Sequence, residues 1–296
     1  MPAAPHDETR IPRAKIAELL KLIKRADSVE VKVVVPMSGH RATIKSIGMD
    51  PIEAEPRQVF FFDTPRLDLY EHGLIVRARR IQGGGGDSVV KLRPVKPEHV
   101  RDELRRSDRF KIEVDAVPGG FVCSGSFSGR CSAQEVLDAA SGETRLSSLL
   151  SKGQRRFFKE HAPGTIGKKI RMNALLTLGP LFVLKGKLKP KKLARVLTVE
   201  LWLFPDGSRN LEISTKCKPD EAFTAAAELR TFLDARGVEI AAGQETKTAA
   251  AMKFFAAHRR LALCKRRAIQ HPAFVVHSLD DQRISRERHR EESGPG

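Results

Sequence analysis

Five short segments of the chain place a charged side chain at every second position, with apolar side chains between them. The segments lie at residues 29–33, 76–79, 90–93, 110–114 and 211–216. A period of two is typical of a β-strand, whose side chains point alternately to opposite faces of a sheet. Each segment would therefore have one apolar face and one face of Lys, Arg and Glu. That mixture suits a polyphosphate with a divalent metal, because Arg and Lys bind phosphate oxygens and carboxylates bind the metal.

The charged faces of these segments carry more basic than acidic side chains. The basic ones are Lys32, Arg77, Arg79, Lys91, Arg93, Arg109, Lys111 and Lys216, and the acidic ones are Glu30, Glu113, Asp115 and Glu212. In any single strand such a face could simply meet water. Like charges on adjacent strands repel, however, and a bound polyanion would relieve that repulsion. A sheet closed with this face inward would favour phosphoryl or nucleotidyl transfer, in which positioning and charge neutralisation supply most of the rate.

Composition limits the possible partners and the compartment. The 296 residues carry a net charge of +17, which favours polyanionic partners, and they fit one large domain with appendages. The four cysteines form no metal-binding spacing, so we expect free thiols in a reducing cytoplasm. No apolar run is long enough to cross a bilayer, and the N-terminus lacks an apolar signal core.

Hydrophobic periodicity and turn residues predict the order of elements. Helices are expected at 12–24, 132–140, 146–150, 220–236 and 246–263, with Ser132 and Glu135 fitting a capping box. Strands are expected at 42–47, 59–62, 74–81, 88–93, 109–115, 155–160, 181–188, 195–203 and 211–216, besides the first segment. The Gly- and Ser-rich stretch 119–129 is expected to be a loop.

These elements suggest three regions. Residues 1–27 would form an N-terminal tail and helix, and residues 28–256 the main domain. Residues 257–296 would form a basic, charged tail that is partly disordered and binds polyanions non-specifically.

The stretch from residue 60 to residue 93 carries a more specific pattern. It reads Phe60-Phe61-Phe62-Asp63-Thr64-Pro65, then Leu69-Tyr70, Gly73, Arg77-x-Arg79 and finally Val89-Val90-Lys91-Leu92-Arg93. This pattern resembles the "YFDT", "L…G…LRxR" and "TxKxR" motifs of the CYTH superfamily, also called triphosphate tunnel metalloenzymes. Weaker likenesses follow the family order at 28–32, 211–214 and 246–247, so the resemblance covers about residues 28 to 256.

The resemblance implies an α+β protein with an eight-stranded antiparallel β-barrel, an open-ended tunnel and flanking helices. Members hydrolyse inorganic, thiamine or nucleoside triphosphates, and some convert ATP to cyclic AMP. Carried over residue by residue, Mg²⁺ or Mn²⁺ would be held by Glu30, Glu212 and Glu113. Glu113 and Lys32 would have catalytic roles. The substrate-binding residues would be Lys32, Arg77, Arg79, Lys91, Arg93, Arg195, Lys216 and Lys247. Strand parity puts Arg195 on the face opposite to Glu200 unless a bulge intervenes.

At three positions where the family pattern has a carboxylate, this sequence has a different residue. Ser28 stands where the first family motif begins with Glu, Lys111 where some members have another carboxylate, and Ser214 where the late Glu pair ends. We therefore carry several hypotheses forward. The first is a metal-dependent triphosphatase, and the second is a class IV type adenylyl cyclase. The third is a polyphosphate- or nucleotide-binding module without catalysis. A nucleic-acid-binding protein is the most remote alternative, since no recognised nucleic-acid motif appears.

Overall fold

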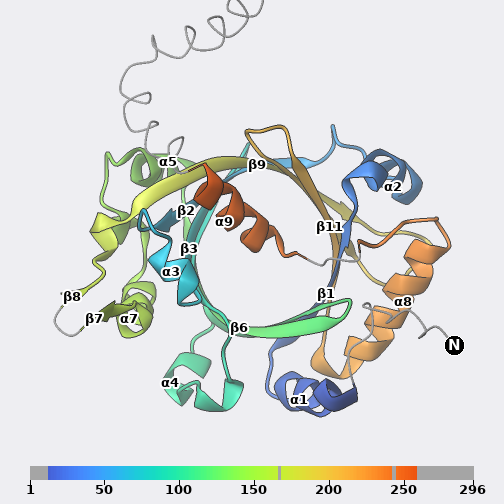
Figure 1. Ribbon diagram of the computed structural model, residues 1–296, viewed down its shortest axis with the longest axis horizontal. Helices are drawn as coiled ribbons and strands as arrows, with labels where there is room; N and C mark the ends of the chain where they lie inside the picture. The colour runs from blue at the N-terminus through green and yellow to red at the C-terminus, as the bar shows by residue number, and fades with distance from the viewer. Residues whose placement is uncertain (1–12, 166–167, 242–244, 259–296) are drawn as a thin grey trace, which may run out of the picture. The chain divides into compact units, whose positions relative to one another are not determined.

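The computed structural model describes residues 13–165, 168–241 and 245–258, and nine strands in these residues close into a barrel (Figure 1). The barrel strands are β1 (Ser28–Val35), β2 (Glu55–Asp63), β3 (Leu74–Ile81), β4 (Gly86–Leu92), β5 (Phe110–Val117), β6 (Gly120–Cys131), β9 (Leu176–Leu188), β10 (Leu197–Leu203) and β11 (Arg209–Cys217). A separate short pair is formed by β7 (Gly164–Thr165) and β8 (Lys168–Lys169).

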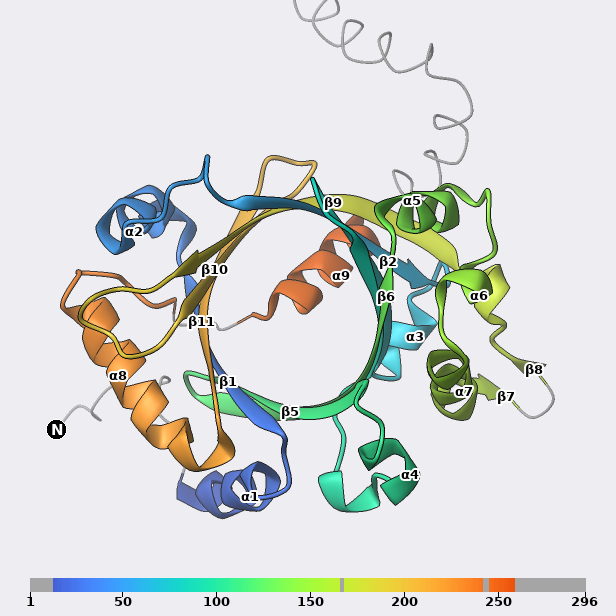
Figure 2. The ribbon, with the colours of Figure 1, turned by 180° about the vertical axis from the view of Figure 1, so that it is seen from behind.

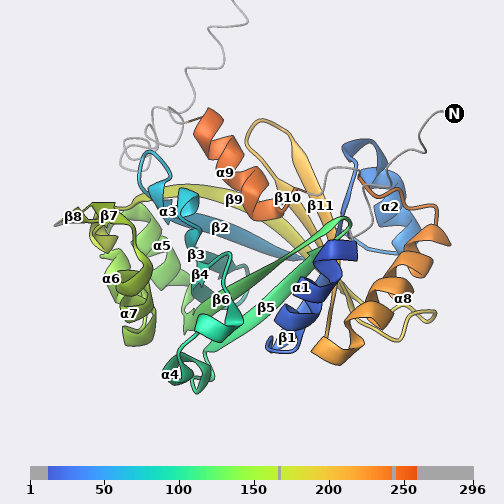
Figure 3. The ribbon, with the colours of Figure 1, turned by 60° about the horizontal axis from the view of Figure 1, so that its bottom comes forward.

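Helices surround the barrel and cross one of its ends. The α-helices are α1 (Arg13–Ile23), α2 (His40–Ile47), α3 (Asp68–Glu71), α4 (Asp102–Arg105), α5 (Ala133–Ser141), α6 (Leu146–Leu149), α7 (Lys152–His161), α8 (Ala222–Asp234) and α9 (Lys247–Ala257). Short 3-10 turns lie at Met37–Gly39, Pro97–His99, Met172–Ala174 and Pro219–Glu221. Figures 1 and 3 show α1, α2 and α8 outside the barrel on one side, and α5, α6 and α7 outside it on the other.

The strands follow one another around the barrel in the order β1-β11-β10-β9-β2-β3-β4-β6-β5. Every neighbouring pair is antiparallel except β1 and β5, which run parallel and close the barrel. The predicted α+β class and barrel are therefore confirmed. The expected eight antiparallel strands are corrected to nine strands in the described residues, with one parallel pair.

The additional strand is β6, which lies in the stretch expected to be a loop. Its glycines are needed where other groups approach the backbone closely. A Cβ atom on Gly125 would lie 2.8 Å from the Phe110 ring, and one on Gly129 would lie 2.6 Å from Gln154 Oε1. Gly and Ser thus serve close packing here, rather than flexibility.

Two short segments expected to be strands are helices. Residues 42–47 belong to α2, and residues 155–160 belong to α7. The second helix begins with a capping box in which Ser151 accepts a hydrogen bond from the Gln154 backbone, and it buries Phe157. The predicted capping box of Ser132 and Glu135 at the start of α5 is confirmed. Helical burial and capping therefore outweigh the short alternations that favoured strands.

The apolar face of the alternating strands points outward, under the helices. Val29, Val31 and Val33 are buried on β1, and they belong to one core with Leu19 of α1 and Leu229 of α8. Because side chains alternate along a strand, the charged residues of β1 point to the barrel interior.

A second apolar group fills one end of the barrel, where β2 and β10 finish. Phe61 of β2 contacts Phe255 of α9 edge-on, with ring centroids 6.4 Å apart, and Phe204 lies 5.6 Å from Phe254. Trp202 of β10 is also buried. Figures 1 and 2 show α9 lying across this opening. The α9 helix thus lies across one end of the barrel, which the sequence analysis did not predict.

The described fold belongs to the first of two units into which the chain divides, Met1–Ala257 and His258–Gly296. The predicted tail at 257–296 falls almost entirely outside the described residues, and so does the predicted extension of the last helix to residue 263. Within the described residues, every helix is too short or too polar to traverse a bilayer.

Candidate functional site

A cavity of about 1080 Å³ lies inside the barrel and is lined mostly by charged side chains. Its basic side chains are Lys32, Arg77, Arg79, Lys91, Arg93, Lys111, Lys185, Lys187, Lys189, Lys216 and Lys247. Its acidic side chains are Glu30, Glu113, Asp115, Glu200 and Glu212. Eleven basic against five acidic side chains leave six positive charges in excess. Among the described residues that line it, the apolar ones are Ile75, Val89 and Val196, and none is aromatic.

The cavity has a buried interior and an exposed rim. Exposed Lys111, Lys187, Lys189 and Lys216 lie toward the end where β9 and β11 finish, opposite to the end crossed by α9. Inside, Asp115, Glu212 and Lys32 are nearly inaccessible to solvent. A polyanion entering past the rim would therefore meet cations along its whole path.

The structure brings together all of the predicted site residues except Arg195. The cavity lining contains Lys32, Arg77, Arg79, Lys91, Arg93, Lys216, Lys247, Glu30, Glu113 and Glu212. Arg195 instead pairs with Glu221 at 2.9 Å and with Glu228 of α8 at 2.6 Å. The expected placement of Arg195 among the phosphate-binding residues is thus wrong, because Arg195 precedes β10 and its guanidinium is held by Glu221 and Glu228, outside the cavity lining.

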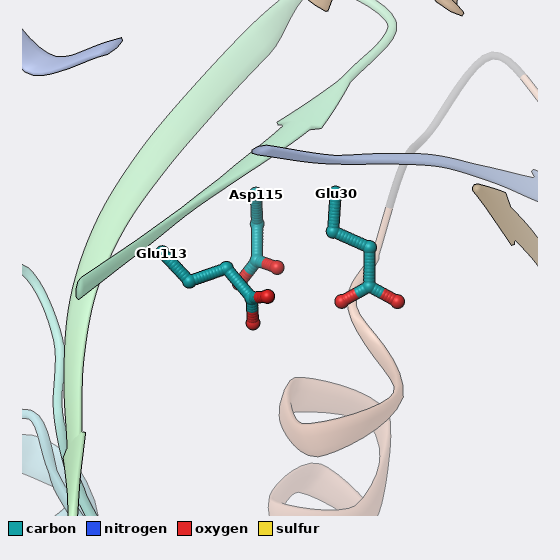
Figure 4. A group of neighbouring side chains, drawn as sticks. All are labelled: Glu30, Glu113 and Asp115. Atoms are coloured by element: carbon teal, nitrogen blue, oxygen red, sulfur yellow. The ribbon is translucent and has the colours of Figure 1, made fainter. Parts of the chain in front are cut away.

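Three carboxylates converge at the parallel seam between β1 and β5 (Figure 4). One oxygen from each of Glu30, Glu113 and Asp115 lies within 4.8 Å of the others. Glu30 and Asp115 are register partners across the seam, and Glu113 precedes Asp115 by two positions on the same face of β5. Carboxylate oxygens at this spacing are the ligands that hard divalent cations prefer, so the residues present fit such an ion.

The two serines that replace family carboxylates donate hydrogen bonds to the carboxylates that remain. Ser28 Oγ donates to Glu113 Oε1 at 3.2 Å, and Ser214 Oγ donates to Glu30 Oε1 at 3.0 Å. Each serine hydroxyl therefore orients a carboxylate of the cluster. Lys111, the third departure, lies on the cavity rim.

Asp115 holds three cations together inside the barrel. Its carboxylate pairs with Lys32 at 3.1 Å, with Lys91 at 3.5 Å and, most closely, with Arg93. Lys32 comes from β1, Lys91 comes from β4, and Arg93 is the residue that follows β4. The sequence placed Asp115 on the charged face but gave it no role as a ligand.

Glu212 and Glu200 form a second acidic group around Lys247. The Lys247 ammonium lies 2.5 Å from Glu200 and 2.8 Å from Glu212, while Lys185 lies 3.5 Å from Glu200 and Lys32 lies 3.8 Å from Glu212. Glu212, predicted to bind metal with Glu30 and Glu113, lies outside the cluster of Glu30, Glu113 and Asp115 and is linked to it through Lys32, whose ammonium is 2.9 Å from Glu30.

These contacts join into one alternating series of charges around the barrel wall. The series runs Lys185, Glu200, Lys247, Glu212, Lys32, Asp115 and Lys91. We call these seven residues the charge series. Each ion pair links two elements: most pairs join neighbouring strands or a strand and α9, and the pair of Asp115 with Lys91 joins β5 and β4 across β6.

Burial and neighbouring charges shift the pKa values of the cations in different directions. Burial lowers the pKa of Lys32, but the carboxylates of Glu212 and Glu30 outweigh it and raise that pKa above its ordinary value. Burial, together with Arg93 and Lys32, lowers the pKa of Lys91 well below its ordinary value. Burial and the neighbouring Arg79 lower the pKa of Arg77 to about 10.

Arg77 and Arg79 differ in how their charge is balanced. Arg79 makes a bidentate pair with Asp87, with N–O distances of 2.8 and 2.9 Å. The Arg77 Nε atom, in contrast, is buried without a hydrogen-bond partner among the described residues. An anion in the cavity would supply the partner that Arg77 needs.

Neighbouring cations lower the pKa values of two carboxylates of the cluster, Glu30 and Glu113. Burial raises the pKa of Glu30, but the Lys32 and Lys247 ammonium groups prevail and lower it to about 2. Burial and Glu30 raise the pKa of Glu113, yet Lys216 and Lys91 bring it below its ordinary value. Both groups are therefore available as anionic ligands.

Sequence reasoning missed Glu200 and the lysines of β9 as cavity residues. The register pairs Glu200 with Lys185 and with Glu212, which shows that β9 and β10 share the charged inner face. The alternation of Lys185, Lys187 and Lys189 is visible in the sequence and could have predicted this face.

Comparisons with solved structures identify the fold. No protein-family model matches the sequence, and no curated protein is similar enough to match it. A candidate adenylyl cyclase from Hippeastrum, reported to have a dominant triphosphatase activity, superimposes with a TM-score of 0.55. It is 17% identical, and the match covers 76% of this chain and 94% of that one.

A candidate adenylate cyclase from Bacillus halodurans gives a TM-score of 0.53 at 14% identity, with 76% of this chain and 97% of that chain covered. At these identities the likeness concerns the fold. The chain therefore shares the barrel fold of these two candidate cyclases, in agreement with the fold that the resemblance to the CYTH superfamily predicts.

Proposed function

We propose that the protein hydrolyses triphosphates, inorganic or organic, in a reaction that depends on Mg²⁺ or Mn²⁺. The observation that carries this proposal is one cavity in which a cationic wall faces three convergent carboxylates. A triphosphate is polyanionic and binds divalent metals, so it needs both kinds of group at once. The reported activity of the Hippeastrum protein, which has the same fold, supports the choice.

In this proposal the cations of the inner wall hold the phosphates. Arg77 and Arg93 supply planar guanidinium donors, and Lys91 adds a point charge. Lys32, whose pKa is raised, stays protonated and neutralises charge that develops on the bridging oxygen. The exposed Lys187, Lys189 and Lys216 on the rim attract the substrate.

Glu30, Glu113 and Asp115 would hold the metal, which would supply positive charge to neutralise the phosphate oxygens. Glu113 is ionised, so its second oxygen can accept a hydrogen bond from the attacking water and orient it. The water oxygen forms a bond to the terminal phosphorus, and the bridging P–O bond breaks. Orthophosphate and diphosphate leave, and the water proton passes to the products or to solvent.

The same cationic grip suits a class IV type adenylyl cyclase, in which the ribose hydroxyl replaces water as the nucleophile. It also suits a module that binds polyphosphate or nucleotide without turnover. The lack of aromatic side chains among the described cavity residues argues against base stacking, and so against a nucleic-acid-binding role. A cytoplasmic location belongs to this proposal and is supported by the free thiols of Cys123, Cys131 and Cys217.

A product assay tests the proposal directly. The purified chain is incubated with tripolyphosphate, ATP or thiamine triphosphate, with Mg²⁺, Mn²⁺ or EDTA, and orthophosphate, diphosphate and cyclic AMP are measured. We expect orthophosphate release that requires the metal. Formation of cyclic AMP and diphosphate would show that the protein is an adenylyl cyclase instead. Binding of a triphosphate without any product would show that it is a binding module.

The Arg77→Ala variant tests whether the cationic wall of the cavity binds phosphate. Loss of a buried, charge-assisted contact of about 2 kcal/mol should weaken tripolyphosphate binding roughly 30-fold in calorimetry. Arg230→Ala is the matched control, because Arg230 is half-exposed on α8 and pairs with Asp234 outside the cavity. Unchanged affinity in Arg77→Ala would contradict phosphate binding at this wall.

A further inference from the structure

The connection between β2 and β3, residues 64–73, carries much of the most specific motif of the sequence, yet none of its residues belongs to the described lining of the cavity. We call these ten residues the motif loop. Asp63, the last residue of β2, is buried, and its carboxylate accepts hydrogen bonds from three backbone N–H groups of the loop. They belong to Thr64 at 2.7 Å, Leu69 at 2.9 Å and Tyr70 at 3.0 Å. One side chain thus gathers both halves of the loop.

Two further features keep the motif loop in one conformation. Thr64 Oγ1 accepts a hydrogen bond from the Asp68 backbone at 3.0 Å and donates one to Asp68 Oδ2 at 2.5 Å. The Leu69 side chain is fully buried in the core. The loop is therefore anchored by its backbone and by an apolar side chain.

The motif loop ends against the backbone of Arg93. The Gly73 carbonyl accepts a hydrogen bond from the Arg93 backbone N–H at 2.8 Å. Gly73 has φ +75°, and a Cβ atom there would overlap the Arg93 carbonyl oxygen, so glycine is required at this contact. Arg93 follows the last residue of β4, which means that Gly73 extends the pairing of β3 with β4 to Arg93.

Tyr70 gives the loop a second link to Arg93. Burial and nearby carboxylates raise the pKa of the Tyr70 hydroxyl, while the Arg93 guanidinium opposes that rise. The two groups therefore lie within electrostatic range of each other. Asp63 holds the backbone of Tyr70, so it influences the surroundings of Arg93 by this route as well.

The Arg93 side chain depends on an accurate position. Its guanidinium lines the cavity and pairs with Asp115, and its Nε atom is buried without a hydrogen-bond partner among the described residues. A guanidinium binds phosphate oxygens through a planar, directional set of N–H donors. A small displacement of its backbone would therefore weaken the contact with phosphate.

We propose that Asp63 is a positioning residue for Arg93. By gathering three N–H groups of the motif loop it fixes Gly73, and Gly73 fixes the backbone from which Arg93 reaches the phosphate. The inference rests on the proposed function for the role of Arg93 in binding phosphate. It gives the Asp-Thr and Gly positions of the motif a physical role in substrate binding, although they lie outside the cavity lining.

Asp63→Asn tests the role of the carboxylate with little change in shape. Both carboxylate oxygens accept N–H groups, so an amide would place its own N–H donors against at least one of them. Tripolyphosphate affinity is measured by calorimetry in EDTA, where metal-dependent turnover does not consume the ligand. We expect binding about tenfold weaker than in the wild type. Asp206→Asn is the matched control, because Asp206 accepts hydrogen bonds in the exposed turn between β10 and β11.

A double-mutant cycle shows whether the effect passes through Arg93. In an Arg93→Met background, Asp63→Asn should change the affinity by less than about twofold, because the positioned group is gone. In a Lys216→Met background the tenfold effect should remain, since Lys216 lies on β11. A general loss of structure would instead lower the affinity by the same factor in every background.

The outcomes separate this inference from the proposed function. Equal losses in the wild-type and Arg93→Met backgrounds would overturn the role of Asp63 and leave the proposed function intact. The expected coupling without any hydrolysis would support this inference and remove the proposed function. A wild-type chain that does not bind tripolyphosphate would overturn both. Circular dichroism checks folding, and Thr64→Val, which removes the hydrogen bonds to Asp68, is judged by the same cycle if Asp63→Asn does not fold.

Discussion

At the scale of single residues, Lys91 shows what a cationic cavity costs the folded protein. Its ammonium is buried beside Arg93 and Lys32, with Asp115 at 3.5 Å as its ion-pair partner. Burial and the two neighbouring cations lower its pKa well below the ordinary value of 10.5. A basic group whose pKa is lowered by folding destabilises the folded state. The cost grows as pH falls from 10.5 toward the lowered pKa and is complete below it.

Lys91→Met should therefore stabilise the protein while weakening its binding of tripolyphosphate. The gain in free energy of unfolding should be present at neutral pH and should shrink as pH rises toward 10.5. Urea denaturation of both proteins over this pH range measures it. Lys21→Met, an exposed change on α1, is the control. A gain that did not depend on pH would contradict the electrostatic origin of the cost.

The basic residues of the site were more predictable than the acidic ones. Arg77 and Lys91 lie in short alternating segments, so their shared face follows from the period of two. The grouping of Asp115 with Glu30, and of Glu212 with Lys247, depends on which strands become neighbours. Strand order is a property of the closed barrel, and the alternation of one segment carries no information about it.

At the scale of elements, β6 shows that glycine can mark tight packing within a strand. Phe110 of β5 lies over Gly125, and Gln154 of α7 bonds to the backbone carbonyls of Ser88 and Phe127 beside it. A Gly- and Ser-rich sequence has no apolar period, so it does not predict a strand by itself. The strand forms because its neighbours β4 and β5 pair with it along its length.

Gly125→Ala should lower the free energy of unfolding by about 1–3 kcal/mol, because its Cβ would be 2.8 Å from the Phe110 ring. Gly120→Ala on the same strand is the matched control, since its Cβ would meet Val117 at an ordinary 3.8 Å. Chemical denaturation of the two variants gives the comparison. Equal stability for both would show that the ring moves aside without cost.

At the scale of the whole molecule, the charge series couples closure of the barrel to assembly of the candidate site, because the same ion pairs join the strands and line the cavity. Its seven members link β9, β10, α9, β11, β1, β5 and β4 through alternating ion pairs. The cavity nevertheless keeps an excess of positive charge, which opposes compaction. A bound polyanion should therefore stabilise the entire fold.

Tripolyphosphate at a hundredfold excess over its Kd should raise the free energy of unfolding by about 2.7 kcal/mol. For a domain of this size that corresponds to a rise in Tm of about 5–10 °C. Differential scanning fluorimetry with and without tripolyphosphate measures the shift. At the same concentration Arg77→Ala should show a smaller shift, and an unchanged Tm in the wild type would argue against a specific complex.

The pairing of β1 with β11, the first and the last strand of the barrel, has a consequence for the synthesis of the chain. Val29 and Cys217 are bonded neighbours although they lie 188 positions apart, so β1 cannot gain its second partner until β11 has left the ribosome. Until then β1 presents an unpaired edge, which is a hazard for aggregation. Glu30 and Lys32 place charged side chains along β1 while this edge is unpaired. The side chains that later surround a ligand would thus first keep the nascent chain from associating with its neighbours.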